Sequence, residues 1–128
     1  FSPSLVNMSS RGSVGTGDSV MIAGVIVGEG NAGILLRALG PELAAQGVPG
    51  VLQNPTLDLY DQDGVVLASN DDWKDTQQTE IEATTIPPTD DREAAILANL
   101  PSGSYTAIVR GKEGMSGIAL VEAYDVGL

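Results

Sequence analysis

The chain has 128 residues, a length that suits a single domain. It contains neither cysteine nor histidine, which excludes disulfides, thiolate and imidazole metal ligands, and the commonest general base. Its 17 acidic and 6 basic residues give a formal net charge of −11, which repels nucleic acid and anionic lipid. No apolar run approaches the ~20 residues that cross a bilayer. We therefore expect neither nucleic-acid binding nor membrane insertion.

The N-terminal segment 1–10 carries four apolar side chains and precedes the glycine-rich stretch 11–17. Such a segment either folds back into its own sheet or adds a strand to the sheet of a neighbouring molecule. We expect 1–10 to be an exchangeable strand and 11–17 its hinge, with self-association through Phe1, Leu5, Val6 and Met8. A chain that begins with Phe rather than Met indicates leader removal or a cut from a longer chain. Leader removal predicts an extracellular or cell-surface location.

Two apolar runs follow, at residues 19–27 and 32–39. Their hydrophobicity is nearly continuous, which predicts strands that are buried on both faces. The intervening residues 28–31 are typical of a hairpin loop. After Gly40-Pro41, residues 42–46 are long enough for one helical turn.

The clearest hairpin joins residues 56–62 to 65–70 through an Asp-Gly dipeptide at 63–64, which favours a two-residue type I′ turn. That turn predicts that Leu59 pairs with Ala68. Four side chains would then face the core: Leu57, Leu59, Val66 and Ala68.

The remaining elements complete an all-β pattern. Residues 90–100 fit a short helix, because Asp90 and Glu93 are spaced as in a capping box, and fit a strand equally well. Residues 104–110 and 117–125 predict a last hairpin. Six or seven short strands with Gly/Pro turns indicate one antiparallel β-sandwich or jelly roll over 1–128, with short loops and at most one or two helical turns.

An acidic cluster over residues 58–75, within and directly after the hairpin at 56–70, invites a calcium interpretation. The strand 65–70 separates Asp61 and Asp63 from the group at its other end, since it spans roughly 20 Å at about 3.4 Å per residue. The candidate ligands are therefore Asp58, Asn70, Asp71, Asp72 and Asp75. A solvated loop without metal is the competing interpretation. Trp73 beside this group could stack on a sugar, or it could cover the end of the core.

Catalytic chemistry has little support in this sequence. A serine triad lacks its histidine, and Lys74 and Lys112 lie in polar loops beside acids, where their pKa should not fall. Nothing fixes two carboxylates at the separation that glycoside hydrolysis needs. We expect a protein that is not an enzyme and requires no cofactor, with calcium as the candidate ion.

Two segments resemble the bacterial pre-peptidase C-terminal domain: residues 57–73 (LDLYDQDGVVLASNDDW), and residues 100–111 (LPSGSYTAIVRG) with 114–117 (GMSG). The likeness covers about 54–125. Residues 9–17 (SSRGSVGTG) and 36–41 (LRALGP) extend it, because the whole chain resembles a module of secreted bacterial surface proteins. The resemblance implies an exported, non-catalytic β-sandwich used in adhesion, assembly or substrate contact.

In the pre-peptidase family some domains are associated with calcium or polymers. Asp61, Asn70, Asp71 and Asp72 match the acidic positions of that family's motif. The chain departs from the family's usual context because no peptidase is attached to it.

Two functions are consistent with these observations. The first is an extracellular structural subunit whose copies associate into a filament or surface assembly by exchange of the N-terminal strand. The alternative is a calcium-assisted module that binds a glycan or another polymer, such as an extracellular polysaccharide.

Overall fold

The computed structural model describes residues 4–17, 19–28 and 30–127, and the side chains from residue 9 onward. In this part of the chain the strands are β1 (Ser4–Val14), β2 (Met21–Val27), β3 (Ala32–Leu39), β4 (Pro55–Tyr60), β5 (Val66–Asn70), β6 (Ala94–Leu100), β7 (Gly103–Gly111) and β8 (Gly117–Asp125). The helices are α1 (Pro41–Ala44) and α2 (Gln78–Ala83), and the 3-10 turns are η1 (Trp73–Asp75) and η2 (Lys112–Gly114).

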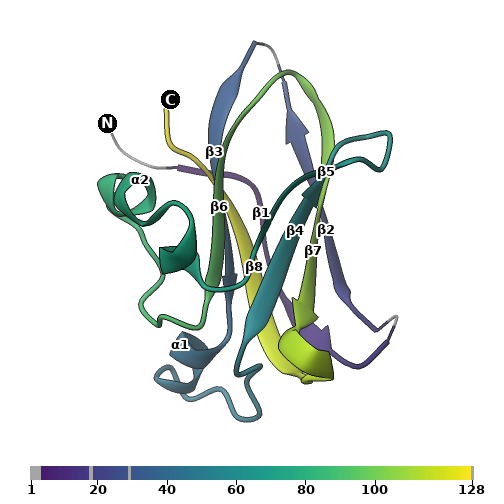
Figure 1. Ribbon diagram of the computed structural model, residues 1–128, viewed down its shortest axis with the longest axis vertical. Coiled ribbons are helices and arrows are strands. Elements are labelled where there is room, and N and C mark those ends of the chain that lie inside the picture. The colour runs from purple at the N-terminus through teal and green to yellow at the C-terminus, as the bar shows by residue number, and fades with distance from the viewer. Residues whose placement is uncertain (1–3, 18, 29, 128) are drawn as a thin grey trace.

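The strands form two four-stranded sheets that pack face to face (Figure 1). One sheet has the order β1-β8-β3-β6 and the other β2-β7-β4-β5, and neighbouring strands are antiparallel throughout. The antiparallel β-sandwich predicted from the sequence is confirmed.

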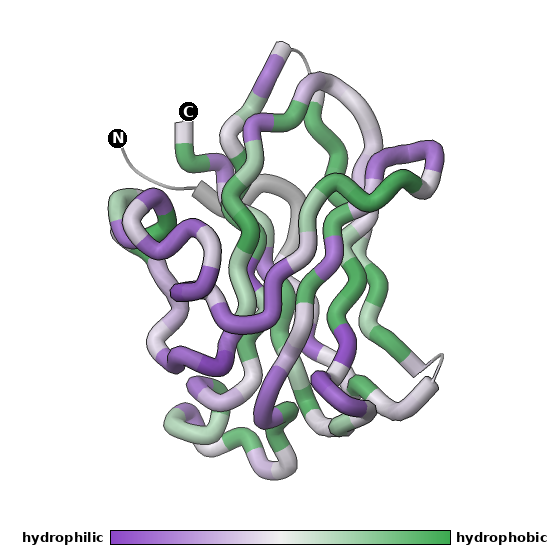
Figure 2. Tube along the Cα trace, viewed as in Figure 1, coloured by the Kyte–Doolittle hydropathy of each residue, from purple (hydrophilic) through white to green (hydrophobic). Residues whose placement is uncertain are grey.

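The core lies between the two sheets and is built from the inward side chains of alternating strand positions. Val25, Leu57 and Val109 from one sheet meet Leu36 and Val121 from the other, and each is at most 1% exposed. Figure 2 shows the hydrophobic residues along the strands and the hydrophilic ones gathered in the loops.

The strand β3 is buried on both of its faces, as its continuous hydrophobicity predicted. Its outward side chain Leu35 packs in a second apolar cluster with Trp73, Ile81, Ala95 and Val126. The segment that carries η1 and α2 therefore covers the outer face of the β1-β8-β3-β6 sheet beside β6 (Figure 1).

Two predictions about consecutive strands are wrong. The strands β2 and β3 lie in different sheets rather than in one hairpin, and so do β7 and β8. In β2 burial alternates strictly, with Ile22 67% and Ile26 65% exposed, so this strand is not buried on both faces. Hydrophobicity marks these segments as strands, but it does not identify the strand that each one pairs with.

The β4–β5 hairpin has the predicted pairing of Leu59 with Ala68 but a different turn. Of the residues in this turn, only Gly64 has a positive φ, of 79°, so a type I′ turn is not formed. The Asp61 carboxylate instead accepts hydrogen bonds from the backbone N–H groups of Asp63 (2.9 Å) and Val65 (3.0 Å). The longer loop shifts the register beyond Leu59, and Val66 is 51% exposed instead of facing the core.

Residues 90–100, which fitted a helix or a strand, form a turn followed by β6. The backbone N–H of Glu93 donates to the carbonyl of Asp90 (3.1 Å), and the backbone N–H of Asp90 donates to the Glu93 carboxyl group (3.2 Å). One of the two capping-box hydrogen bonds, from the Asp90 backbone to the Glu93 side chain, is therefore present, and a strand follows it rather than a helix.

One end of the sandwich is closed by Leu52, which is fully buried between the sheets. Its backbone N–H donates to the carbonyl of Ile118 (2.8 Å). A Cβ atom at Gly40 would overlap the carbonyl oxygen of Leu52, and a Cβ atom at Gly117 would lie 2.5 Å from its nitrogen. Glycine is required at both positions because backbone approaches backbone there.

We predict that Gly40→Ala lowers the free energy of unfolding by about 1–3 kcal/mol, because the added methyl group must displace the Leu52 backbone. Gly24→Ala is the matched control, since no atom lies within 4 Å of its Cβ position, and its change should stay within about 0.5 kcal/mol. Urea unfolding followed by Trp fluorescence measures both. Equal effects would contradict this account of the closed end.

Candidate functional site

Residues 70–77, here called the strap, leave β5 and run along the outer edge of β6. The side-chain amide of Gln77 donates to the carbonyl of Leu97 (2.9 Å) and accepts the backbone N–H of Leu97 (3.0 Å). The Asn70 side chain accepts the backbone N–H of Ala95 (2.9 Å). Two side chains thus satisfy backbone groups that a neighbouring strand would otherwise bond, and they cover a sheet edge.

Asn70, a predicted calcium ligand, is only 6% exposed, and both ends of its amide are engaged. Its nitrogen donates to the Asp72 carbonyl (3.1 Å) and to the Thr76 hydroxyl (3.1 Å), while its oxygen accepts from Ala95. The residue holds the strap in its turn and ties it to β6.

The other predicted calcium ligands are distributed over separate contacts. Asp58, on the outer face of the β2-β7-β4-β5 sheet, pairs with Arg110 (2.8 Å), and Asp71 pairs with Lys112 (2.7 Å). Asp75 is exposed on η1, and its backbone N–H donates to the Asp72 carbonyl (3.0 Å). The described residues contain no group of three or more Asp, Glu, His or Cys side chains placed to hold a metal ion. Calcium binding stays a prediction from the sequence.

Asp72 differs from its acidic neighbours. Its Oδ1 atom is buried and has no hydrogen-bond partner within the described part of the chain. Burial, followed by the charges of Asp71 and Asp75, raises the pKa of Asp72 above its usual range. The ionised form of the Asp72 side chain is therefore less stable here than it would be in water.

The Trp73 ring anchors the strap rather than standing at the surface. It is 4% exposed and packs against Leu35 and Ile81, with the Lys74 ammonium 5.6 Å from its ring centroid. Its backbone N–H donates to the Glu93 carbonyl (2.9 Å). Stacking of this ring on a sugar would require the strap to lift away from β6.

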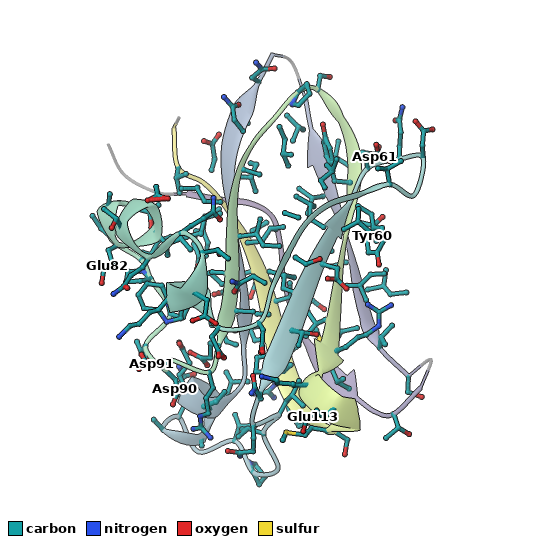
Figure 3. The ribbon with its side chains drawn as sticks, in the orientation of Figure 1. Tyr60, Asp61, Glu82, Asp90, Asp91 and Glu113 are labelled. Atoms are coloured by element: carbon teal, nitrogen blue, oxygen red, sulfur yellow. The ribbon has the colours of Figure 1, made fainter. Side chains whose placement is uncertain are left out.

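A pair of carboxyl groups that the sequence did not single out lies close to the strap. Glu93, directly before β6, is fully buried, and its Oε2 accepts the backbone N–H groups of Gly40 (2.9 Å) and Glu42 (3.0 Å). Glu42, on α1, reaches back to accept the backbone N–H and the hydroxyl of Thr89 (3.0 Å each). Figure 3 shows the neighbouring Asp90 and Asp91 in the turn before β6, beside α1.

Burial and the hydrogen bond with Glu42 raise the pKa of Glu93 to about 8, against a smaller opposite effect of the backbone N–H donors. Burial also raises the pKa of Glu42, but the hydrogen bonds from Glu93 and Thr89 outweigh it and lower that pKa. A hydrogen bond between two carboxyl groups requires one proton, and the opposite pKa shifts assign that proton to Glu93. The spacing of Asp90 and Glu93 was the only sequence signal for this pair.

The predicted exchangeable segment belongs to β1, which pairs with β8 of the same chain at the edge of its sheet. Phe1 lies outside the described residues. Leu5, Val6 and Met8 lie on β1, and their side chains are outside the part that the structure describes. The pairing is irregular between Leu5 and Ser9. Because β1 continues to Val14, residues 11–14 of the predicted hinge belong to the strand.

The β4–β5 hairpin carries exposed apolar side chains and lies beside a hollow. Val65, Val66 and Leu67 are 46–54% exposed in succession. An open hollow of about 500 Å³ beside the hairpin is lined by Tyr60, Asp61, Gln62, Gly64, Ser104, Thr106 and Ile108. Figure 3 shows Tyr60 and Asp61 where the hairpin projects from the sheet.

No helix in the described part of the chain is both long and apolar enough to cross a bilayer. No protein-family model matches this chain, and no curated protein matches it significantly.

Among solved structures, the chain is similar to the pre-peptidase C-terminal domain of a collagenase from Bacillus anthracis, with a TM-score of 0.58. The sequence identity is 14%, and the match covers 92% of this chain and 89% of that chain. A likeness at this identity shows the fold. The chain has the β-sandwich fold of pre-peptidase C-terminal domains, as the resemblance of its two segments predicted.

We predict that Asn70→Ala lowers the free energy of unfolding by about 1–3 kcal/mol, because it leaves the buried N–H of Ala95 without a partner. Asn99→Ala, on the exposed part of β6, removes the same chemical group and should change stability by no more than about 0.5 kcal/mol. Chemical unfolding of the two variants gives the comparison. If Asn70→Ala were as mild as the control, the strap would not be covering β6 as described.

Proposed function

We propose that the protein is an exported, non-catalytic β-sandwich subunit whose copies associate by exchanging β1. One observation carries the proposal: β1 is the first strand of the described chain and lies at a sheet edge, and few of its described side chains, those of residues 9–14, enter the core. Ser9, Ser10, Arg11 and Ser13 are exposed on it, and Val14 is the buried residue of its described side chains.

Release of β1 from its own sheet disturbs little else. Within the described residues its strand pairing is with β8 alone, so the pairs β8–β3, β3–β6 and all those of the second sheet survive its departure. The vacated edge of β8 then accepts β1 of another copy through the same hydrogen bonds. Exchange of an identical element has a low energetic cost for this reason.

The connection from β1 to β2 is suited to such a change. It turns tightly, with the backbone N–H of Gly15 donating to the carbonyl of Ser19 (2.6 Å) and Gly17 in a left-handed conformation, φ 61°. Glycine also adopts extended backbone readily, so the turn can open into a straight connection between two copies. A short hinge of this kind favours domain swapping.

Charge supplies a further argument about assembly. Arg37, Lys74, Arg92, Arg110 and Lys112 each form an ion pair within the chain. Arg11, on the exchanging strand, is the one basic residue without such a pair among the described residues, and its side chain is exposed. In a chain of net charge −11 it is free to pair with an acidic neighbour. Copies still repel one another, so salt should promote the assembly.

Engineered cysteines test the exchange directly, because the natural chain has none. Ser13 and Ile118 are Cα partners across β1 and β8, a position from which a disulfide is feasible. We expect Ser13→Cys with Ile118→Cys, concentrated in moderate salt and then oxidised, to give disulfide-linked dimers and longer chains on a non-reducing gel. Each single-cysteine variant serves as the control for random cross-linking.

Light scattering after size exclusion completes the test on the unmodified chain. Species larger than 13.1 kDa should appear at high concentration and disappear when residues 1–10 are deleted. Monomers at every concentration, with only intrachain disulfides in the double variant, would contradict the exchange.

The unpartnered Oδ1 of Asp72 beside Asp71 and Asp75 supports a second candidate, a calcium-assisted module that binds an extracellular polysaccharide. On this alternative, calorimetry detects calcium binding that is lost in Asp71→Ala with Asp72→Ala, while the fold is retained. Absence of heat in the unmodified chain would contradict it. The same light-scattering runs, with calcium and with chelator, separate the two candidates.

A further inference from the structure

The carboxyl groups of Glu93, which is buried, and Glu42, which is half-buried, join two loops that are distant in sequence. Glu93 reaches from the turn before β6 to the backbone of α1, and Glu42 reaches from α1 back to Thr89. Each of the two side chains therefore bonds to the segment that carries the other, and together they join α1 to the turn before β6. Neither proposed function uses this pair.

The same turn also holds the strap. The backbone carbonyl of Glu93 accepts the N–H of Trp73, and two residues later the N–H of Ala95 donates to Asn70. Movement of Glu93 therefore acts on the contact that anchors the only tryptophan of the chain over the sheet. From that contact the strap continues to Gln77, which covers Leu97.

We propose that Glu42 and Glu93 form a proton-dependent latch that keeps the strap closed over the edge of β6. The latch is closed while one proton is shared between the two carboxyl groups. When that proton is lost, the buried Glu93 carboxylate and the half-buried Glu42 carboxylate repel each other, and the turn before β6 moves away from α1.

The other charged groups around the pair do not remove this repulsion. Arg37 on β3 acts on Glu42, but its guanidinium is bonded to Glu122 on β8. Arg92 acts on Glu93 from the same turn and is paired with Asp90 (3.0 Å). Both cations are therefore already engaged with other carboxylates.

The direction of the pH dependence follows from the shifted proton affinity. The closed form holds the proton of Glu93 up to about pH 8, whereas in the open form the turn has moved away from α1 and the Glu93 carboxyl group ionises near its usual value of 4.5. The closed form thus binds more protons between these two values. The ratio of closed to open molecules should fall by up to about tenfold for each pH unit across this range and become constant above about pH 8.

Hydrogen exchange measured by NMR tests the latch, because the amides of Ala95 and Leu97 are protected by strap side chains. Between pH 5.5 and 8.5, we expect their protection, corrected for the intrinsic exchange rate, to fall by about a hundredfold or more. Val25 and Ala107, in the other sheet, should remain better protected than these two amides at every pH. This difference shows that the strap opens without unfolding of the sandwich.

Two variants isolate the carboxyl pair. Glu93→Gln keeps the size and hydrogen-bonding capacity of the side chain and should abolish the pH dependence at Ala95 and Leu97. Glu80→Gln makes the same substitution on the exposed surface of α2 and should leave the pH dependence at Ala95 and Leu97 unchanged. Should Glu93→Gln prove too unstable to measure, Glu42→Gln provides the second test, because removal of the partner carboxylate must reduce the dependence.

The latch is contradicted if Ala95 and Leu97 show no pH-dependent protection, or if the dependence is the same in Glu93→Gln and the unmodified chain. It is also contradicted if both amides exchange only together with Val25 and Ala107. None of these outcomes depends on whether β1 is exchanged between copies.

Discussion

The backbone N–H and C=O groups along the edge of a β-sheet have no strand to bond, and each must find another partner or face water. A sandwich of two open sheets has four such edges, here β1 and β6 in one sheet and β2 and β5 in the other. Two of these edges, those of β6 and β1, differ in whether other residues cover them. At β6, Asn70 and Gln77 occupy the place of a strand, and Trp73 fixes the segment that carries them. At β1, most of the described side chains are exposed.

The difference between the β6 and β1 edges relates the stability of the protein to the proposed exchange of β1. The polar strap that covers β6 is held in place by the buried ring of Trp73. It is also held by the hydrogen bond from the Trp73 backbone to the turn that contains the buried Glu93. A buried carboxyl group is costly unless it is hydrogen-bonded, and Glu93 accepts the backbone N–H groups of Gly40 and Glu42. Burial and the Glu42 side chain raise its pKa, which favours the neutral form. The described part of the β1 edge has no comparable cover, and this difference is the reason for proposing β1 as the strand that copies exchange.

The sequence predicted what local chemistry determines. The Asp-Gly dipeptide predicted the pairing of Leu59 with Ala68. The exposure of Val66 could not be foreseen, because it depends on the Asp61 carboxylate rebuilding the turn. Sheet membership of β2 and β3 was missed, since periodicity reports burial and not partners. The Glu42–Glu93 contact spans 51 residues and leaves no local pattern. Of the predicted site residues, Asn70 and Trp73 are brought together, but as parts of the strap.

Peptide-resolved hydrogen exchange of the monomer at neutral pH tests most directly whether the two edges differ. The account predicts that residues 9–14 of β1 exchange much faster than residues 94–99 of β6, because few buried contacts hold β1 and the strap protects β6. Equal protection of the two edges, or a better protected β1, would contradict the claim that β1 is the strand released for assembly.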